Sequence, residues 1–123
     1  MEQLIAHLVG DYVLQNHWMA TKKTTSSLAA FVHVMLYGLP FLLLVSNPLQ
    51  WLVIVGTHFA IDRWRLAKYW IEFWGIGCPG WLSRTFGNDE ESATAPPFLG
   101  VWLLIIVDNT AHLTINYLAL SQL

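Results

Sequence analysis

The order of apolar and polar residues divides the chain into four hydrophobic stretches joined by polar connections. The clearest stretch, 28–45 ("LAAFVHVMLYGLPFLLLV"), contains no Asp, Glu, Lys or Arg. At about 1.5 Å per residue, a helix of this length crosses most of a hydrocarbon layer about 30 Å thick. Three weaker stretches are interrupted by His, Asp or Asn. The pattern predicts an all-α, polytopic membrane protein with four transmembrane helices, over about 3–20, 27–46, 48–66 and 97–120.

The amino-acid composition supports this class of protein. Hydrophobic residues make up 55% of the 123 residues and charged residues only 11%, which is too apolar for an ordinary soluble domain. We therefore expect one transmembrane domain over 1–123, with the lipid bilayer as a partner. The net charge of -2 argues against nucleic acid as a partner, and the single cysteine, Cys78, excludes an intramolecular disulfide. The N-terminus lacks the basic leader of a cleavable signal sequence, so we expect it to be retained.

The basic residues predict the orientation in the membrane. Lys22 and Lys23 lie between the first two stretches, and four more basic residues follow the third. Because cytoplasmic loops carry an excess of Lys and Arg, both charged connections should face the cytoplasm and both termini the other side of the inner membrane. The segment "RWRLAKYWIEFW" mixes cations with aromatic residues, as helices at the headgroup level do. We expect a cytoplasmic interfacial helix over about 63–74, followed by a loop over 75–96.

Three of the four stretches contain a histidine and an aspartate four residues apart. On a helix this spacing stacks the two side chains on one face, one turn apart. The second stretch adds His33 alone, and the pair in the fourth stretch runs in the reverse order, as expected if successive helices alternate in direction. The three pairs are His7 with Asp11, His58 with Asp62, and Asp108 with His112.

These residue types point to a divalent metal ion. Imidazole nitrogen and carboxylate oxygen are ligands for zinc, which is our first choice, and for manganese or iron as alternatives. A metal ion would also neutralise carboxylates that are costly in hydrocarbon. The first group of expected ligands is Asp11, His33, His58 and Asp62, and the group that completes this site or forms a second one is His7, Asp108 and His112.

A metal site of this kind could activate water to hydrolyse a lipid-linked or phosphorylated substrate. The metal-bound water would be the nucleophile, and Asp11 or Asp108, where not a ligand, could act as the general base. Gln15 lies one turn beyond Asp11, and together with Asn109 it could hold the ligands in place. His17 points to another face of its helix, near the interface.

Other interpretations of the same polar pairs remain open. A His and an Asp four residues apart can hydrogen-bond to each other or to a neighbouring helix, which contributes about 0.6 kcal/mol. Ionisable groups in membrane spans also form ion or proton pathways. The alternative is therefore a non-enzymatic membrane protein, either an ion or proton conductor or an assembly partner, whose pairs are interhelical hydrogen bonds. Association into a homo-oligomer is a further expectation for so small a bundle.

Several of these motifs together resemble a known family. The opening "HLVGDYVLQNHWMATKK" is similar to the N-terminal signature of domain-of-unknown-function family 3307, a family of small bacterial and phage membrane proteins. His7, Asp11 and Gln15 match its pattern, with Tyr12 where phenylalanine is usual. The segments "AAFVHVMLY", "THFAIDRWR" and "VDNTAHL" look like its later polar motifs, so that the resemblance covers almost the whole chain.

A second, more distant resemblance concerns the membrane-bound metal-dependent hydrolases of the inner membrane, whose spans carry comparable His and Asp residues. The first family implies no activity, and the second implies metal-dependent hydrolysis only by analogy.

Overall fold

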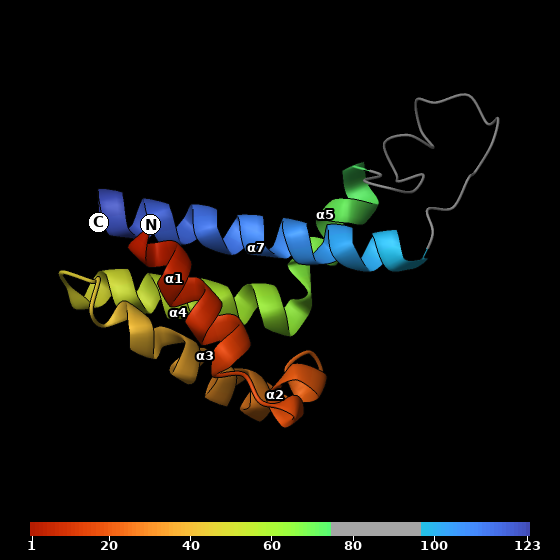
Figure 1. The fold of residues 1–123 in the computed structure, drawn as a ribbon, viewed down its shortest axis with the longest axis horizontal. Coiled ribbons are helices and arrows are strands. Elements are labelled where there is room, and N and C mark those ends of the chain that lie inside the picture. The colour runs from red at the N-terminus through yellow and green to blue at the C-terminus, as the bar shows by residue number, and fades with distance from the viewer. Residues whose placement is uncertain (75–96) are drawn as a thin grey trace. The chain divides into compact units, whose positions relative to one another are not determined.

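The structure is a computed structural model that describes residues 1–74 and 97–123 (Figure 1). The loop predicted over 75–96 lies outside the described residues, as do Cys78 and Arg84. Every regular element in the described part is a helix, so the all-α prediction is confirmed there. The chain forms two compact units, which are described separately. The first contains Met1–Arg65 and Ala111–Leu123, and the second contains Leu66–Thr110.

The N-terminal segment forms three short helical elements: α1 (Glu2–Leu8), the π-helical turn η1 (Val9–Val13) and α2 (His17–Lys22). The helix predicted over 3–20 is thus divided. The break follows from Asn16, whose extended backbone cannot continue a helix and whose side-chain oxygen accepts a hydrogen bond from the Met19 N–H at 2.9 Å. A new helix therefore begins at His17.

A pair of longer helices, α3 (Ser27–Phe41) and α4 (Pro48–Trp64), forms the centre of the first unit. Ser26 caps the start of α3, and Asn47 caps α4 ahead of a proline at its first position. The α3 helix ends before the predicted residue 46. After Phe41 the chain continues in tighter turns, in which the Leu42 N–H donates to the Leu39 carbonyl at 3.1 Å and the Leu44 N–H to the Phe41 carbonyl at 2.9 Å.

The helices α3 and α4 approach closely at Gly38. The Trp51 indole N–H donates to the Gly38 carbonyl at 2.9 Å, and a Cβ atom on this glycine would lie 2.7 Å from Val55. Only a residue without a side chain fits this contact.

The last helix, α7 (Pro97–Gln122), contributes its C-terminal part to the first unit. There the Gln50 side chain donates to the Leu120 carbonyl at 3.4 Å, and Asn47 donates to Leu123 at 3.2 Å. Residues 1–3 line the same pocket as Leu120 and Ser121, so both chain ends lie at the same end of this unit, as Figure 1 also shows. The apolar core of the unit is formed by Ala6, Tyr37, Phe41, Ile54 and Ala119.

The second unit contains α5 (Leu66–Trp74) and the beginning of α7. Arg65 separates α5 from α4 by adopting a left-handed conformation, with φ 52° and ψ 47°. The helix predicted over 63–74 therefore begins at Leu66. Its surface carries an ion pair between Lys68 and Glu72, with the charged atoms 3.4 Å apart.

Among the described residues, one helix is long and apolar enough to cross a membrane. It covers Gly100–Gln122, 23 residues with a mean hydropathy of 1.3. The helix Ser27–Phe41 is also apolar but shorter.

Candidate metal centre

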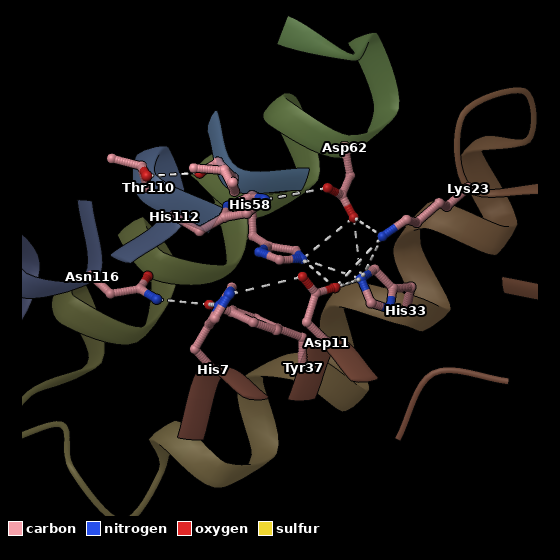
Figure 2. Close-up of polar contacts among 11 residues, drawn as sticks. His7, Asp11, Lys23, His33, Tyr37, His58, Asp62, Thr110, His112 and Asn116 are labelled. Carbon is pink, nitrogen blue, oxygen red and sulfur yellow. Dashed lines mark hydrogen bonds and ion pairs between the residues drawn. The ribbon is translucent and has the colours of Figure 1, made fainter. Parts of the chain in front are cut away.

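Four buried side chains from three elements direct their polar atoms to one point inside the first unit (Figure 2). Asp11 comes from η1, His33 from α3, and both His58 and Asp62 from α4. One ligand atom of each lies within 4.8 Å of one atom of every other. These groups could hold a metal ion.

The separations match those of a tetrahedral site. Ligands about 2.0 Å from a zinc ion have separations of about 3.3 Å along the edges of the tetrahedron. The His33 Nε2 atom lies 3.1 Å from His58 Nε2, 3.2 Å from Asp11 Oδ1 and 3.1 Å from Asp62 Oδ2. The His58 Nε2 atom lies 3.4 Å from Asp62 Oδ2 and 3.7 Å from Asp11 Oδ1. Five of the six edges are therefore close to the value for a metal site.

The chemistry of these atoms also fits a bound cation. Asp11 Oδ1 and Asp62 Oδ2 are buried, and among the described residues they accept no hydrogen bond of good geometry, although Lys23 forms an ion pair with both. Carboxylate oxygens and imidazole nitrogens at such distances repel one another unless a positive charge or a proton lies between them. In the same part of the chain, the Nδ1 atoms of His33 and His58 are also buried without hydrogen-bond partners.

The π-helical turn η1 brings Asp11 into the site. In this turn the Leu14 N–H donates to the Val9 carbonyl at 2.9 Å, which widens the helix by one residue. The turn lies tightly against α3, because a Cβ atom on Gly10 would be 2.9 Å from the Tyr37 carbonyl oxygen. Glycine at this position therefore allows the close approach that places Asp11 beside His33.

Stacked rings hold His58 in place. The Tyr37 ring lies on one side of it, with centroids 3.6 Å apart, and the His112 ring lies at 3.9 Å. His112 also contacts Asp62, with Nε2 3.3 Å from Oδ1, the oxygen that does not face the other ligands. Groups that orient metal ligands in this way strengthen metal binding.

A second polar chain extends from the site through Tyr37. The Tyr37 hydroxyl accepts a hydrogen bond from the Asn116 side chain at 2.7 Å and lies 3.0 Å from His7 Nδ1. Whether His7 Nδ1 donates to this hydroxyl or accepts from it depends on the tautomer of the ring. The other ring nitrogen of His7 faces Asp11 Oδ2 at 4.0 Å.

Lys23 also reaches the site (Figure 2). Its ammonium nitrogen lies 2.7 Å from Asp62 Oδ2, and 3.5 Å from both Asp11 Oδ1 and His33 Nε2. The connection that carries Lys23 is fixed by Arg63, which donates to the Thr24 carbonyl at 2.7 Å and to the Ser27 hydroxyl at 3.2 Å. Lys23 is thus held beside the carboxylates by its backbone as well as its charge.

The remaining candidates from the sequence are not among these four ligands. Gln15 is half-buried in the connection after η1, and His17 is exposed on α2. Asp108 and Asn109 belong to the second unit, so their roles as ligand, base or orienting group stay predictions.

Sequence reasoning missed two residues of the site, Lys23 and Tyr37. In the sequence, Lys23 indicates only the orientation of the chain in the membrane. Tyr37 had a signal in the sequence, since it follows His33 by four residues, as Asp62 follows His58.

Comparison with known proteins identifies a family but no characterised relative. A family model described as "Protein of unknown function (DUF3307)" matches residues 1–121. No curated protein and no solved structure matches the chain. The similarity to membrane-bound metal-dependent hydrolases is therefore not shown by these comparisons.

Proposed function

The chain belongs to the DUF3307 family of proteins of unknown function, and we propose from its site alone that it binds a divalent metal ion inside a membrane. Zinc is the first choice of metal, with manganese and iron as alternatives. The ligands in this proposal are Asp11, His33, His58 and Asp62.

The observation that carries the proposal is the set of five separations, from 3.1 to 3.7 Å, among two imidazole nitrogens and two carboxylate oxygens. Interhelical hydrogen bonding alone would favour separate donor and acceptor pairs. Here the atoms converge on one point, and each is supplied by a residue type that binds zinc.

The distribution of polar and apolar side chains supports a membrane location. Four histidines and two aspartates of the first unit are buried, whereas many of its large apolar side chains face outward. Phe31, Leu43 and Leu52 are 55%, 89% and 60% exposed. A soluble protein of this size would normally bury such residues, and intramembrane ionisable groups normally face a bundle interior.

The proposed topology has four spans in the inner membrane, with the Lys22–Lys23 connection in the cytoplasm and both termini on the other side. The position of both chain ends at one end of the first unit is compatible with this topology. The site would then open toward the cytoplasm beside Lys23, the most exposed of its charged side chains at 16%.

The activity we propose for the site is hydrolysis of a lipid-linked or phosphorylated substrate. Water would add to phosphorus, the bond to the leaving alcohol would break, and the alcohol oxygen would take up a proton. The metal would polarise a phosphoryl oxygen. Because four protein ligands fill a tetrahedral zinc ion, this reaction needs a fifth coordination position or a metal such as manganese that takes more ligands.

The metal is tested by measuring bound zinc, manganese and iron in protein purified in detergent without chelator. We expect about one ion per chain, lost in His58→Ala and Asp62→Asn and retained in His17→Ala, which alters an exposed histidine. Substoichiometric metal in the unmodified protein would overturn the proposal. Release of inorganic phosphate from phosphatidic acid vesicles, absent in His58→Ala, then tests hydrolysis separately.

One observation favours a second, non-enzymatic function. The 2.7 Å ion pair between Lys23 and Asp62 already gives the carboxylates a cation from the protein itself. A bundle of this kind could be an assembly partner whose polar pairs only join helices. In that case no metal is bound, and His58→Ala lowers the thermal unfolding midpoint without changing the metal content.

A further inference from the structure

We propose that the Lys23 ammonium group is the resident cation of the metal-free site, and that it and a divalent metal ion exclude one another. This inference rests on the proposed metal site. In this proposal the Lys23 ammonium lowers the affinity of the site for metal, and it must leave the carboxylates when a metal ion binds.

The position of the ammonium group is the first reason. It lies within 3.5 Å of three of the four ligand atoms, those of Asp11, His33 and Asp62. It therefore covers one face of the ligand set. A dication held by the four ligands would face this ammonium directly, at a distance where like charges repel strongly in a site shielded from water.

The charge of the site is the second reason. Two buried carboxylates, Asp11 and Asp62, contribute two negative charges, with side chains only 6% and 2% exposed. The Lys23 ammonium balances one of these charges, whereas a single divalent ion balances both. Uncompensated charge is costly in a buried site, so a metal ion makes the ammonium unnecessary there.

The third reason is that Lys23 can leave without unfolding its surroundings. It lies at the C-terminal cap of α2, and its side chain is 16% exposed, more than either carboxylate it contacts. The Arg63 contacts with Thr24 and Ser27 hold the backbone beside it. A long lysine side chain can then move its charge outward to water or to lipid headgroups while its backbone stays fixed.

Exchange has a measurable consequence for metal affinity. If the ammonium occupies the site in most metal-free molecules, only the remaining molecules can bind metal. The apparent affinity for metal is then reduced in proportion to the fraction of molecules whose site is open. Removing the ammonium should therefore tighten metal binding, although Lys23 itself lies beside the ligands. A residue that assisted metal binding would have the opposite effect.

The experiment is a titration of the detergent-purified full chain with Zn²⁺ in the presence of a competing chelator. We expect Lys23→Met to bind Zn²⁺ at least tenfold more tightly than the unmodified protein. Lys22→Met, which removes the same charge from an exposed neighbouring position, should bind as the unmodified protein does. Equal or weaker binding by Lys23→Met overturns the exchange while the metal site itself stands. Absence of Zn²⁺ binding by the unmodified protein overturns both.

A second measurement uses only the unmodified protein, in case Lys23→Met does not fold. Amine acetylation, located by mass spectrometry, reports how accessible each lysine is. Saturating Zn²⁺ should increase the acetylation rate of Lys23 severalfold and leave that of Lys22 unchanged. An unchanged rate at Lys23, in protein shown to contain Zn²⁺, contradicts the exchange.

Discussion

Tyr37 lies nearly flat against His58, with ring centroids 3.6 Å apart and planes 17° apart, and its hydroxyl accepts a hydrogen bond from Asn116 of α7. One side chain thus joins α3, α4 and α7. Its ring positions a candidate ligand, and its hydroxyl completes the hydrogen-bond chain to His7.

Two substitutions distinguish the effect of the Tyr37 ring from the effect of its hydroxyl. Tyr37→Phe keeps the stack and should lower the free energy of unfolding by about 1–3 kcal/mol through the lost hydroxyl contacts, with little change in zinc affinity. Tyr37→Leu also removes the stack and should weaken zinc binding by about 10- to 100-fold. Thermal unfolding and zinc titration measure the two effects. Equal zinc affinities in both variants would show that the stack does not position His58.

A methyl group at Gly10 should disrupt the approach of η1 to α3. The new Cβ atom would lie 2.9 Å from the Tyr37 carbonyl oxygen, which cannot move without moving α3. We expect Gly10→Ala to lower stability by about 1–3 kcal/mol and to weaken metal binding. Gly56→Ala is the matched control, since a Cβ atom there meets nothing within 4 Å, and in a helix it should be neutral or stabilising. Similar losses in both variants would contradict the structure of this contact.

Metal should stabilise the folded protein. At free Zn²⁺ a hundredfold above the dissociation constant, the free energy of unfolding should rise by about 2.7 kcal/mol, and a chelator should reverse the gain. His58→Ala should show no such gain, and His17→Ala should show all of it. A gain that survives in His58→Ala would place the metal at another site.

Arg65 should be replaceable by glycine with a gain in stability. Its φ of 52° is unfavourable for a residue with a side chain, so Arg65→Gly should stabilise the protein by about 1 kcal/mol. Arg65→Ala removes the same charge but keeps the Cβ atom, and it should give no such gain. Thermal unfolding in detergent compares the two, and a lower midpoint for Arg65→Gly than for Arg65→Ala would contradict the left-handed assignment.

If the protein lies in a membrane, a charged residue at an outward-facing apolar position should strongly reduce its insertion. Leu52 is 60% exposed on α4, and a soluble protein would tolerate an aspartate at such a position. In a span, Leu52→Asp should lower the amount of inserted protein, whereas Leu52→Ala should not. The cost should lie below the value of about 2.5–3.5 kcal/mol for an aspartate at a helix centre, because Leu52 is near the start of α4. Extraction of membranes with alkaline carbonate measures insertion. Recovery of the unmodified protein in the soluble fraction would exclude the four-span proposal.

Helix periodicity explains which parts of the site could be predicted from the sequence. The spacing of His58 and Asp62 places both on one face of a helix, and in the structure their facing atoms lie 3.4 Å apart. His33 was identifiable because an ionisable residue is rare in so apolar a stretch. The helical class followed from the same pattern, although the division of 3–20 at Asn16 did not, because apolar periodicity continues across that residue.

The contribution of Lys23 could not be predicted in this way. A long, flexible side chain in a connection is not directed by any periodicity, and its reach depends on how Arg63 fixes the backbone beside it. The η1 turn was equally hidden, because its close contact with α3 joins Gly10 and Tyr37, residues far apart in the sequence. Both features arise from tertiary packing.

Under the proposed exchange, the contact between Lys23 and Asp62 sets the order of folding and metal binding. A chain that depended on an external ion would keep two uncompensated carboxylates in its interior from insertion until that ion arrived. With the ammonium supplied from the same chain, 2.7 Å from the carboxylate, the helices can associate first and receive metal afterwards. Maturation of the site is then a replacement of one cation by another within a bundle that is already folded.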